Sequence, residues 1–147
     1  MMARMEKWLI RLCRAAMMGI GWGAAWVPVS LSVGPVIERF TGLVDEPWFI
    51  AGVITGFPCG AVFSVIAGIA TERRALDELP VGRAAALGAA SGLLVGVAWL
   101  VLALLSDPPK WLFEGMVVAS LTLLSAVSGA GAALMARIGN NRKAHAI

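Results

Sequence analysis

Residues 48–70 read WFIAGVITGFPCGAVFSVIAGIA, an apolar run without a single charged residue. A small residue recurs at every fourth position within this run, at Gly52, Gly56, Gly60, Ser64 and Gly68. Small side chains at this spacing let a second helix approach closely inside a membrane. Each four-residue step turns about 40° around a helix, so the five positions sweep roughly 160°. The stretch therefore predicts a membrane-spanning helix whose small-residue ridge packs against one partner at a right-handed crossing, or against two neighbours.

The composition of the whole chain points to the same environment. Of its 147 residues, 59% are hydrophobic and 14% are charged, against roughly 45–50% and about 25% in soluble domains. Four segments approach the roughly 20 apolar residues that a spanning helix needs, at 15–37, 48–70, 83–105 and 111–136. We predict one all-α membrane domain over residues 1–147, a four-transmembrane-helix bundle with an amphipathic lead at 1–14 and a tail at 137–147.

The basic residues predict how the bundle is oriented. Ten of the twelve lie before the first span, between the second and third spans, or after the fourth: Arg4, Lys7, Arg11, Arg14, Arg73, Arg74, Arg83, Arg137, Arg142 and Lys143. Only Arg39 and Lys110 lie in the other two connections. By the positive-inside rule, both termini and the middle connection are cytoplasmic. We therefore expect an integral protein of a bacterial inner membrane, with the lipid bilayer as its partner and no binding of nucleic acid.

The first fourteen residues have an amphipathic helix pattern. Their basic residues recur at steps of three, four and three, and Trp8, Leu9 and Leu12 lie on the other side. Such a segment can lie on the anionic inner leaflet, or it can be the positively charged lead that orients the first span. The second interpretation is favoured, and a cleaved signal peptide is disfavoured because the apolar region continues past Ala25.

Small residues at helix-packing spacing recur in the other three spans. The third span repeats the four-residue step of the second, and the fourth carries a serine and a glycine four residues apart. The residues expected at helix-packing interfaces are Gly19, Gly23, Gly52, Gly56, Gly60, Ser64, Gly68, Gly88, Gly92, Gly96, Ser125 and Gly129.

The two halves of the chain resemble each other. Residues 14–23 and 83–92 both read Arg-Ala-Ala, two residues, Gly, three residues, Gly, and residues 63–68 resemble residues 124–129. Duplication would give two helical hairpins in the same orientation, as in parallel transporter repeats. The alternative is chance similarity in a chain rich in alanine and glycine.

Three features near the ends and middle of the spans carry further expectations. Pro28 in the first span predicts a bend there, and Trp48 and Trp111 open the second and fourth spans as interfacial anchors. Glu114 lies one turn into the fourth span. We expect its carboxylate to reach the solvated rim by extending along the helix.

The chemistry-bearing residues do not form a recognisable catalytic or metal-binding motif. No acid or base lies in the middle of a predicted span, and the single histidine, His145, is in the tail. We expect a non-catalytic protein without cofactor or metal, a scaffold or accessory subunit that forms a homo-oligomer or joins a larger membrane complex. The alternative is a small channel or facilitator whose polar path is lined by Thr55, Ser64, Ser120, Thr122 and Ser125.

Overall fold

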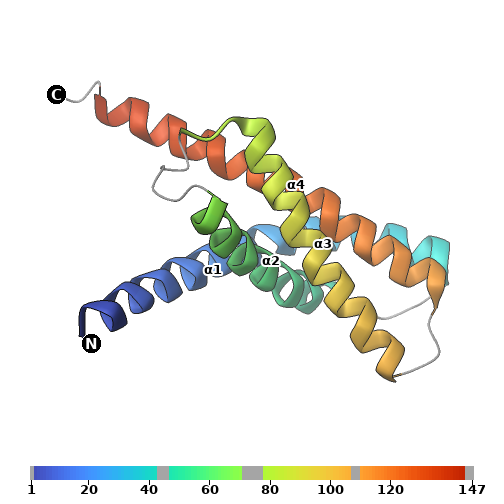
Figure 1. The fold of residues 1–147 in the computed structure, drawn as a ribbon. Helices are drawn as coiled ribbons and strands as arrows, with labels where there is room; N and C mark the ends of the chain where they lie inside the picture. Colours follow the sequence, from blue (N-terminus) through green and yellow to red (C-terminus); the bar gives the residue numbers. More distant parts are fainter. Residues whose placement is uncertain (1, 43–46, 71–77, 107–109, 145–147) are drawn as a thin grey trace.

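The computed structural model describes residues 2–42, 47–70, 78–106 and 110–144, which form four helices (Figure 1). These are α1 (Met2–Thr41), α2 (Trp48–Ala70), α3 (Val81–Ser106) and α4 (Trp111–Ala144). Each helix is long and apolar enough to cross a membrane. The prediction of an all-α chain with four candidate membrane spans is confirmed. The bounds of α2 are those predicted, and α3 is longer than predicted by two residues at its start and one at its end.

The helix ends follow from residues with special backbone chemistry. Pro47 precedes α2, and its carbonyl accepts the amide hydrogens of Ile50 and Ala51. Pro80 has the same relation to the first turn of α3. After α1, Gly42 has a φ of 68° and donates its amide to the carbonyl of Glu38. A glycine in this left-handed conformation is a common way to end a helix.

Two helices, α1 and α4, extend well beyond the predicted spans. α1 is continuous over 40 residues and contains both Pro28 and Pro35, so the predicted lead at 1–14 belongs to the first helix and the expected bend near Pro28 does not interrupt it. At 1.5 Å per residue α1 is about 60 Å long, twice the roughly 30 Å of the hydrocarbon layer. α4 continues to Ala144 and so includes most of the predicted tail.

The helices are arranged as two hairpins, α1 with α2 and α3 with α4, which meet mainly through α2 and α3. The start of α1 and the end of α4 lie at the same end of the molecule, which we call the proximal end (Figure 1). The opposite end, where α1 leads into α2 and α3 into α4, is the distal end. The sequence also predicts that the second helix extends beyond the membrane, with Arg73 and Asp77, and Arg74 and Glu78, paired one turn apart. Residues 71–77 lie outside the described residues.

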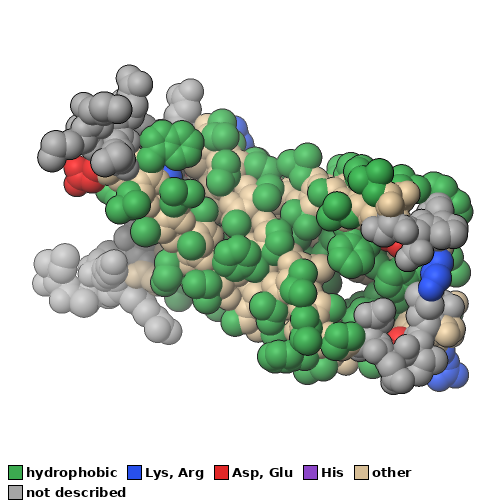
Figure 2. Space-filling view, turned by 90° about the horizontal axis from the view of Figure 1, so that it is seen from below, with side chains coloured by type: hydrophobic (Ala, Val, Ile, Leu, Met, Phe, Trp, Pro, Cys, Tyr) green, Lys and Arg blue, Asp and Glu red, His purple; other side chains and the backbone are tan. Residues whose placement is uncertain are grey.

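Aromatic side chains fill the centre of the bundle. Phe63 of α2 is fully buried, and its ring stacks on that of Trp22 of α1 with centroids 5.1 Å apart. Trp22 also stacks on Trp26, one turn further along α1. Large apolar side chains are exposed along the outside of all four helices (Figure 2), as expected for surfaces that face lipid.

Candidate functional site

The glycines at the start of the α2 ridge bring its backbone against α1. A Cβ placed on Gly56 would lie 3.0 Å from the carbonyl oxygen of Trp22, and one on Gly60 would lie 2.8 Å from that of Met18. From the α1 side, a Cβ on Gly19 would lie 2.9 Å from the carbonyl oxygen of Phe57. Glycine Cα–H groups that face carbonyl oxygens in this way make weak hydrogen bonds across the crossing. The neighbour on this part of the ridge is the chain's own first helix.

The remainder of the α2 ridge has a different environment. A Cβ on Gly68 would meet no atom within 4 Å, and Ser64 is half-buried. Gly52 belongs with the packed part, because a Cβ there would meet the Ser30 hydroxyl and the carbonyl oxygen of Trp26. The packing role of Gly68 stays a prediction.

The α3–α4 hairpin has a glycine crossing of its own. A Cβ on Gly88 would collide with the carbonyl of Ser125, and one on Gly92 would collide with that of Leu121. In the reverse direction, a Cβ on Gly129 would lie 2.5 Å from the carbonyl oxygen of Ala84. Gly96 has more room, because its nearest neighbour is the Val118 side chain at 3.2 Å. Backbone therefore touches backbone in this hairpin as it does in the first.

The two crossings do not share the register that the sequence similarity suggests. Gly19 and Gly88 are matched in the two similar segments, yet Gly19 faces the carbonyl of Phe57 and Gly88 that of Ser125. By this contact, Ser125 in the second hairpin corresponds to Phe57 in the first. The sequence similarity instead matches Ser125 with Ser64, two helical turns after Phe57. Gly129 is closely packed whereas its sequence match, Gly68, is not. The match between residues 63–68 and 124–129 is therefore not reflected in the contacts.

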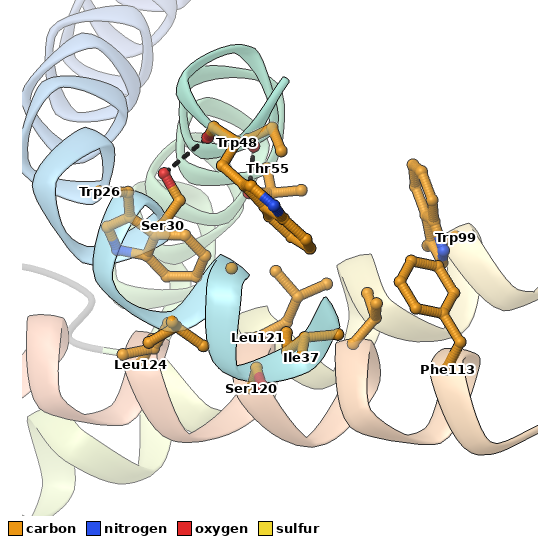
Figure 3. Close-up of a pocket in the computed structure, with 14 residues that line it drawn as sticks. Trp26, Ser30, Ile37, Trp48, Thr55, Trp99, Phe113, Ser120, Leu121 and Leu124 are labelled. Carbon is orange, nitrogen blue, oxygen red and sulfur yellow. Dashed lines mark hydrogen bonds between the residues drawn. The ribbon is translucent and has the colours of Figure 1, made fainter. Parts of the chain in front are cut away.

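A cavity of about 170 Å³ lies in the distal half of the bundle, between the two hairpins. Its wall comes from all four helices and includes Trp26, Trp48, Trp99 and Phe113, whose rings are seen in Figure 3. Two of the five residues predicted to line a polar path, Thr55 and Ser120, are on this wall. The sequence pattern of single helices carried no signal for the cavity, because its wall comes from all four of them.

The other predicted path residues lie elsewhere. Thr122 donates its hydroxyl hydrogen to the carbonyl of Val118 in its own helix. Ser125 is fully buried at the α3–α4 crossing, and its Oγ lies 2.7 Å from the position of a Cβ on Gly92. Together with Ser64 they are absent from the cavity wall. The described residues therefore do not bring the five hydroxyls into one continuous path.

A tryptophan and a glutamate close each hairpin near its distal end. The indole nitrogen of Trp48 donates to a carboxylate oxygen of Glu38, and that of Trp99 donates to Glu114 at 2.8 Å. The expectation that Glu114 is solvated at the rim is wrong, since the residue is only 8% exposed and accepts this bond. Trp48 likewise does more than anchor a helix at an interface. A hydrogen bond to a carboxylate is stronger than one between neutral groups, so each pair fixes one hairpin.

A side-chain hydrogen bond joins the two hairpins, from the Trp26 indole to the Ser128 hydroxyl at 3.1 Å. It links α1 to α4 at the proximal side of the cavity.

Comparison with known proteins found no matching family model, no similar curated protein and no similar solved structure. The function must therefore be argued from the geometry of this chain.

Proposed function

We propose that the chain is a non-catalytic integral membrane protein that acts by association, as a scaffold or accessory subunit. The observation that carries the proposal is the length of α1 and α4. α1 has 40 residues and α4 has 34, where a spanning helix needs about 20. Their proximal ends diverge in Figure 1. The molecule thus offers two projecting helices to a partner in addition to its lipid-facing surface.

The glycine contacts change which helix face is available for association. The residues Gly52, Gly56 and Gly60 are already in contact with α1, so they are not free to bind another protein. Two glycines of α4, Gly115 and Gly131, have no atom within 4 Å of an added Cβ. The two positions are sixteen residues apart, roughly 160° around a helix, so they lie on different sides of α4. We propose that a second copy or a larger membrane complex packs against the outward surface of α4 at one or the other of them.

The proposed topology has both termini in the cytoplasm of a bacterial cell, at the proximal end. It rests on the distribution of lysine and arginine. We also propose that the two hairpins descend from one duplicated hairpin. The support is the similarity of residues 14–23 to 83–92, together with the close backbone packing at glycines that both hairpins have, in different registers.

The proposal is tested by affinity purification from native membranes followed by native mass spectrometry. We expect a second copy or a defined partner with the wild-type chain, and its loss with Gly115→Leu or Gly131→Leu. Gly82→Leu on α3 is the matched control, because its Cβ would also meet open space. A species that is strictly monomeric and free of partners would contradict the proposal, as would complexes that both α4 variants retain.

A small channel or facilitator is the second candidate. The observation in its favour is that Thr55 and Ser120, from different hairpins, meet at one cavity. Against it, the wall of the cavity is mainly apolar and lies in the distal half only. Flux of ions, water or small neutral solutes in proteoliposomes, reduced by Thr55→Val and Ser120→Ala, would favour this candidate over the scaffold.

A further inference from the structure

The cavity between the hairpins has a wall whose polar groups are almost all engaged elsewhere. The indole N–H groups of Trp26, Trp48 and Trp99 donate to Ser128, Glu38 and Glu114. The hydroxyls of Ser30 and Thr55 donate to backbone carbonyls (Figure 3). The remaining wall hydroxyl, on Ser120, is in a helix, where serine can bond a carbonyl one turn back. The wall therefore presents ring faces and C–H groups to an occupant.

A wall of this kind selects the chemistry of what it binds. A polar occupant would lose its hydrogen bonds to water and regain almost none, which is unfavourable. Apolar cavities of about 150 Å³ are known to stay dry and to admit benzene, and this cavity is of similar size at about 170 Å³. The cavity therefore suits a hydrocarbon group.

The position of the cavity identifies the source of that group. It is partly open, and Figure 2 shows a hollow between the hairpins on a side of the bundle, near the distal end. In a chain with four membrane spans, the sides of the bundle face lipid. The hydrocarbon present there at the highest concentration is the acyl chain of a lipid in the distal leaflet.

Two cations lie at the distal rim, where the phosphate group of such a lipid would be. Arg39 lies two residues after Ile37, the last cavity-lining residue of α1, and Lys110 lies three residues before Phe113, the first of α4. Both side chains are exposed. The neighbouring acids Glu38 and Glu114 are held by indoles. The rim thus offers a phosphate group two exposed cations, in connections that by sequence also carry the acids Asp45, Glu46 and Asp107.

We propose that the cavity is a phospholipid site, with one acyl chain of a distal-leaflet lipid between the hairpins and its phosphate near Arg39 and Lys110. The hydrocarbon fills the space that the glycine-packed hairpins leave where they separate. The site does not depend on the scaffold function, because it requires only that the chain lies in a bilayer.

The test uses vesicles that contain phosphatidylglycerol with a photoreactive diazirine in one acyl chain. After irradiation, labelled residues are mapped by mass spectrometry. Leu121 and Leu123 provide an internal comparison on α4, because Leu121 lines the cavity and is 4% exposed, whereas Leu123 is 68% exposed. We expect label on both residues in the wild-type chain.

Filling the cavity should remove the label on Leu121 and keep the label on Leu123. Ala51→Phe and Ser120→Phe fill it from opposite hairpins, and each should lower the ratio of Leu121 label to Leu123 label by about tenfold or more, a factor equivalent to 1.4 kcal/mol. Ala119→Phe is the matched control, because Ala119 is the exposed neighbour of Ser120. Two filling variants are used so that misfolding of one, seen by circular dichroism, leaves the other as the test.

The phosphate is tested at the rim. Arg39→Glu and Lys110→Glu should each lower the label on Leu121 by about fivefold, the effect of one cation near an anionic membrane surface. Arg14→Glu, an exposed cation at the proximal end of α1, should leave it unchanged. The proposal is overturned if wild-type Leu121 is unlabelled, or if a folded filling variant keeps the label. It is also overturned if native mass spectrometry finds a bound small molecule in place of a phospholipid.

Discussion

The contacts inside each hairpin differ from those in the seam between the two hairpins. Inside a hairpin, glycines such as Gly56 and Gly88 let one helix backbone touch the other. At the seam, the packing is made by large side chains such as Phe63 and Trp26, and it leaves a cavity in the distal half. Because association of helices in lipid depends on close packing, the molecule is two firm hairpins joined by a weaker contact.

The largest effect is expected inside a hairpin, from Gly88→Leu. The new side chain would meet the backbone of Ser125, which cannot move aside as a flexible side chain can. The free energy of unfolding should fall by about 3 kcal/mol or more, the upper part of the range for overpacking. Thermal unfolding in detergent measures it, with Gly82→Leu as the control in open space. Equal stability of the two variants would contradict the backbone contact.

The seam should respond less, and Phe63→Ala tests it. The Phe63 ring is fully buried; it stacks on Trp22 inside the first hairpin, and across the seam it lies 3.2 Å from the position of a Cβ on Gly129 of α4. Because lipid is as apolar as the core, removal of the ring loses little transfer free energy, and the main cost is the cavity that is left behind. The free energy of unfolding should fall by about 2 kcal/mol. Crosslinking between α1 and α2 should persist in this variant while crosslinking between α1 and α4 weakens. Loss of both together would show that the hairpins are not separate units.

The closure of a hairpin at its distal end is tested by Glu114→Gln. The amide keeps the shape and an acceptor for the Trp99 indole but removes the charge, so the bond weakens and the variant loses about 1 kcal/mol. Glu38→Gln should cost less, because Glu38 is more exposed than Glu114. Thermal unfolding of the two variants and of Trp99→Phe gives the comparison. A Glu114→Gln variant as stable as the wild type would contradict a structural role for this carboxylate.

The smallest effect is expected from the bond that crosses the seam between Trp26 and Ser128. Hydrogen bonds between membrane helices are worth about 0.6 kcal/mol on average. A double-mutant cycle of Trp26→Phe and Ser128→Ala should give a coupling energy of this size. A coupling near zero would mean that this bond adds nothing to the packing of the seam.

The number of helices and most of their ends could be predicted from the sequence. Hydrophobicity and length identify a span whatever its neighbours are, which is why the range of α2 was correct. The close approach at Gly52, Gly56 and Gly60 was also expected from spacing. The sequence of one helix does not say whether its partner is another protein or the chain's own α1, because that depends on how the helices are placed.

The features missed by sequence reasoning all join residues from different helices. The sequence predicts Glu114 at a solvated rim, but the indole of Trp99 on the preceding helix donates a hydrogen bond to its carboxylate inside the hairpin. The cavity needs four helices, and no single helix shows it. The continuity of α1 through Pro28 and Pro35 agrees with the predicted span at 15–37, because contacts with neighbouring helices can maintain a proline-containing helix in a membrane; the bend expected near Pro28 stays a prediction.

The most direct test of the two-hairpin account measures distances by pulsed electron paramagnetic resonance in lipid nanodiscs, with Cys13 and Cys59 replaced. Spin labels at Phe40 and Phe49 report on the α1–α2 hairpin, and labels at Phe49 and Leu105 report across the seam; all three positions are exposed. The account predicts a narrow distance distribution within the hairpin and a clearly broader one across the seam. Equally narrow distributions, or a broader one within the hairpin, would contradict it.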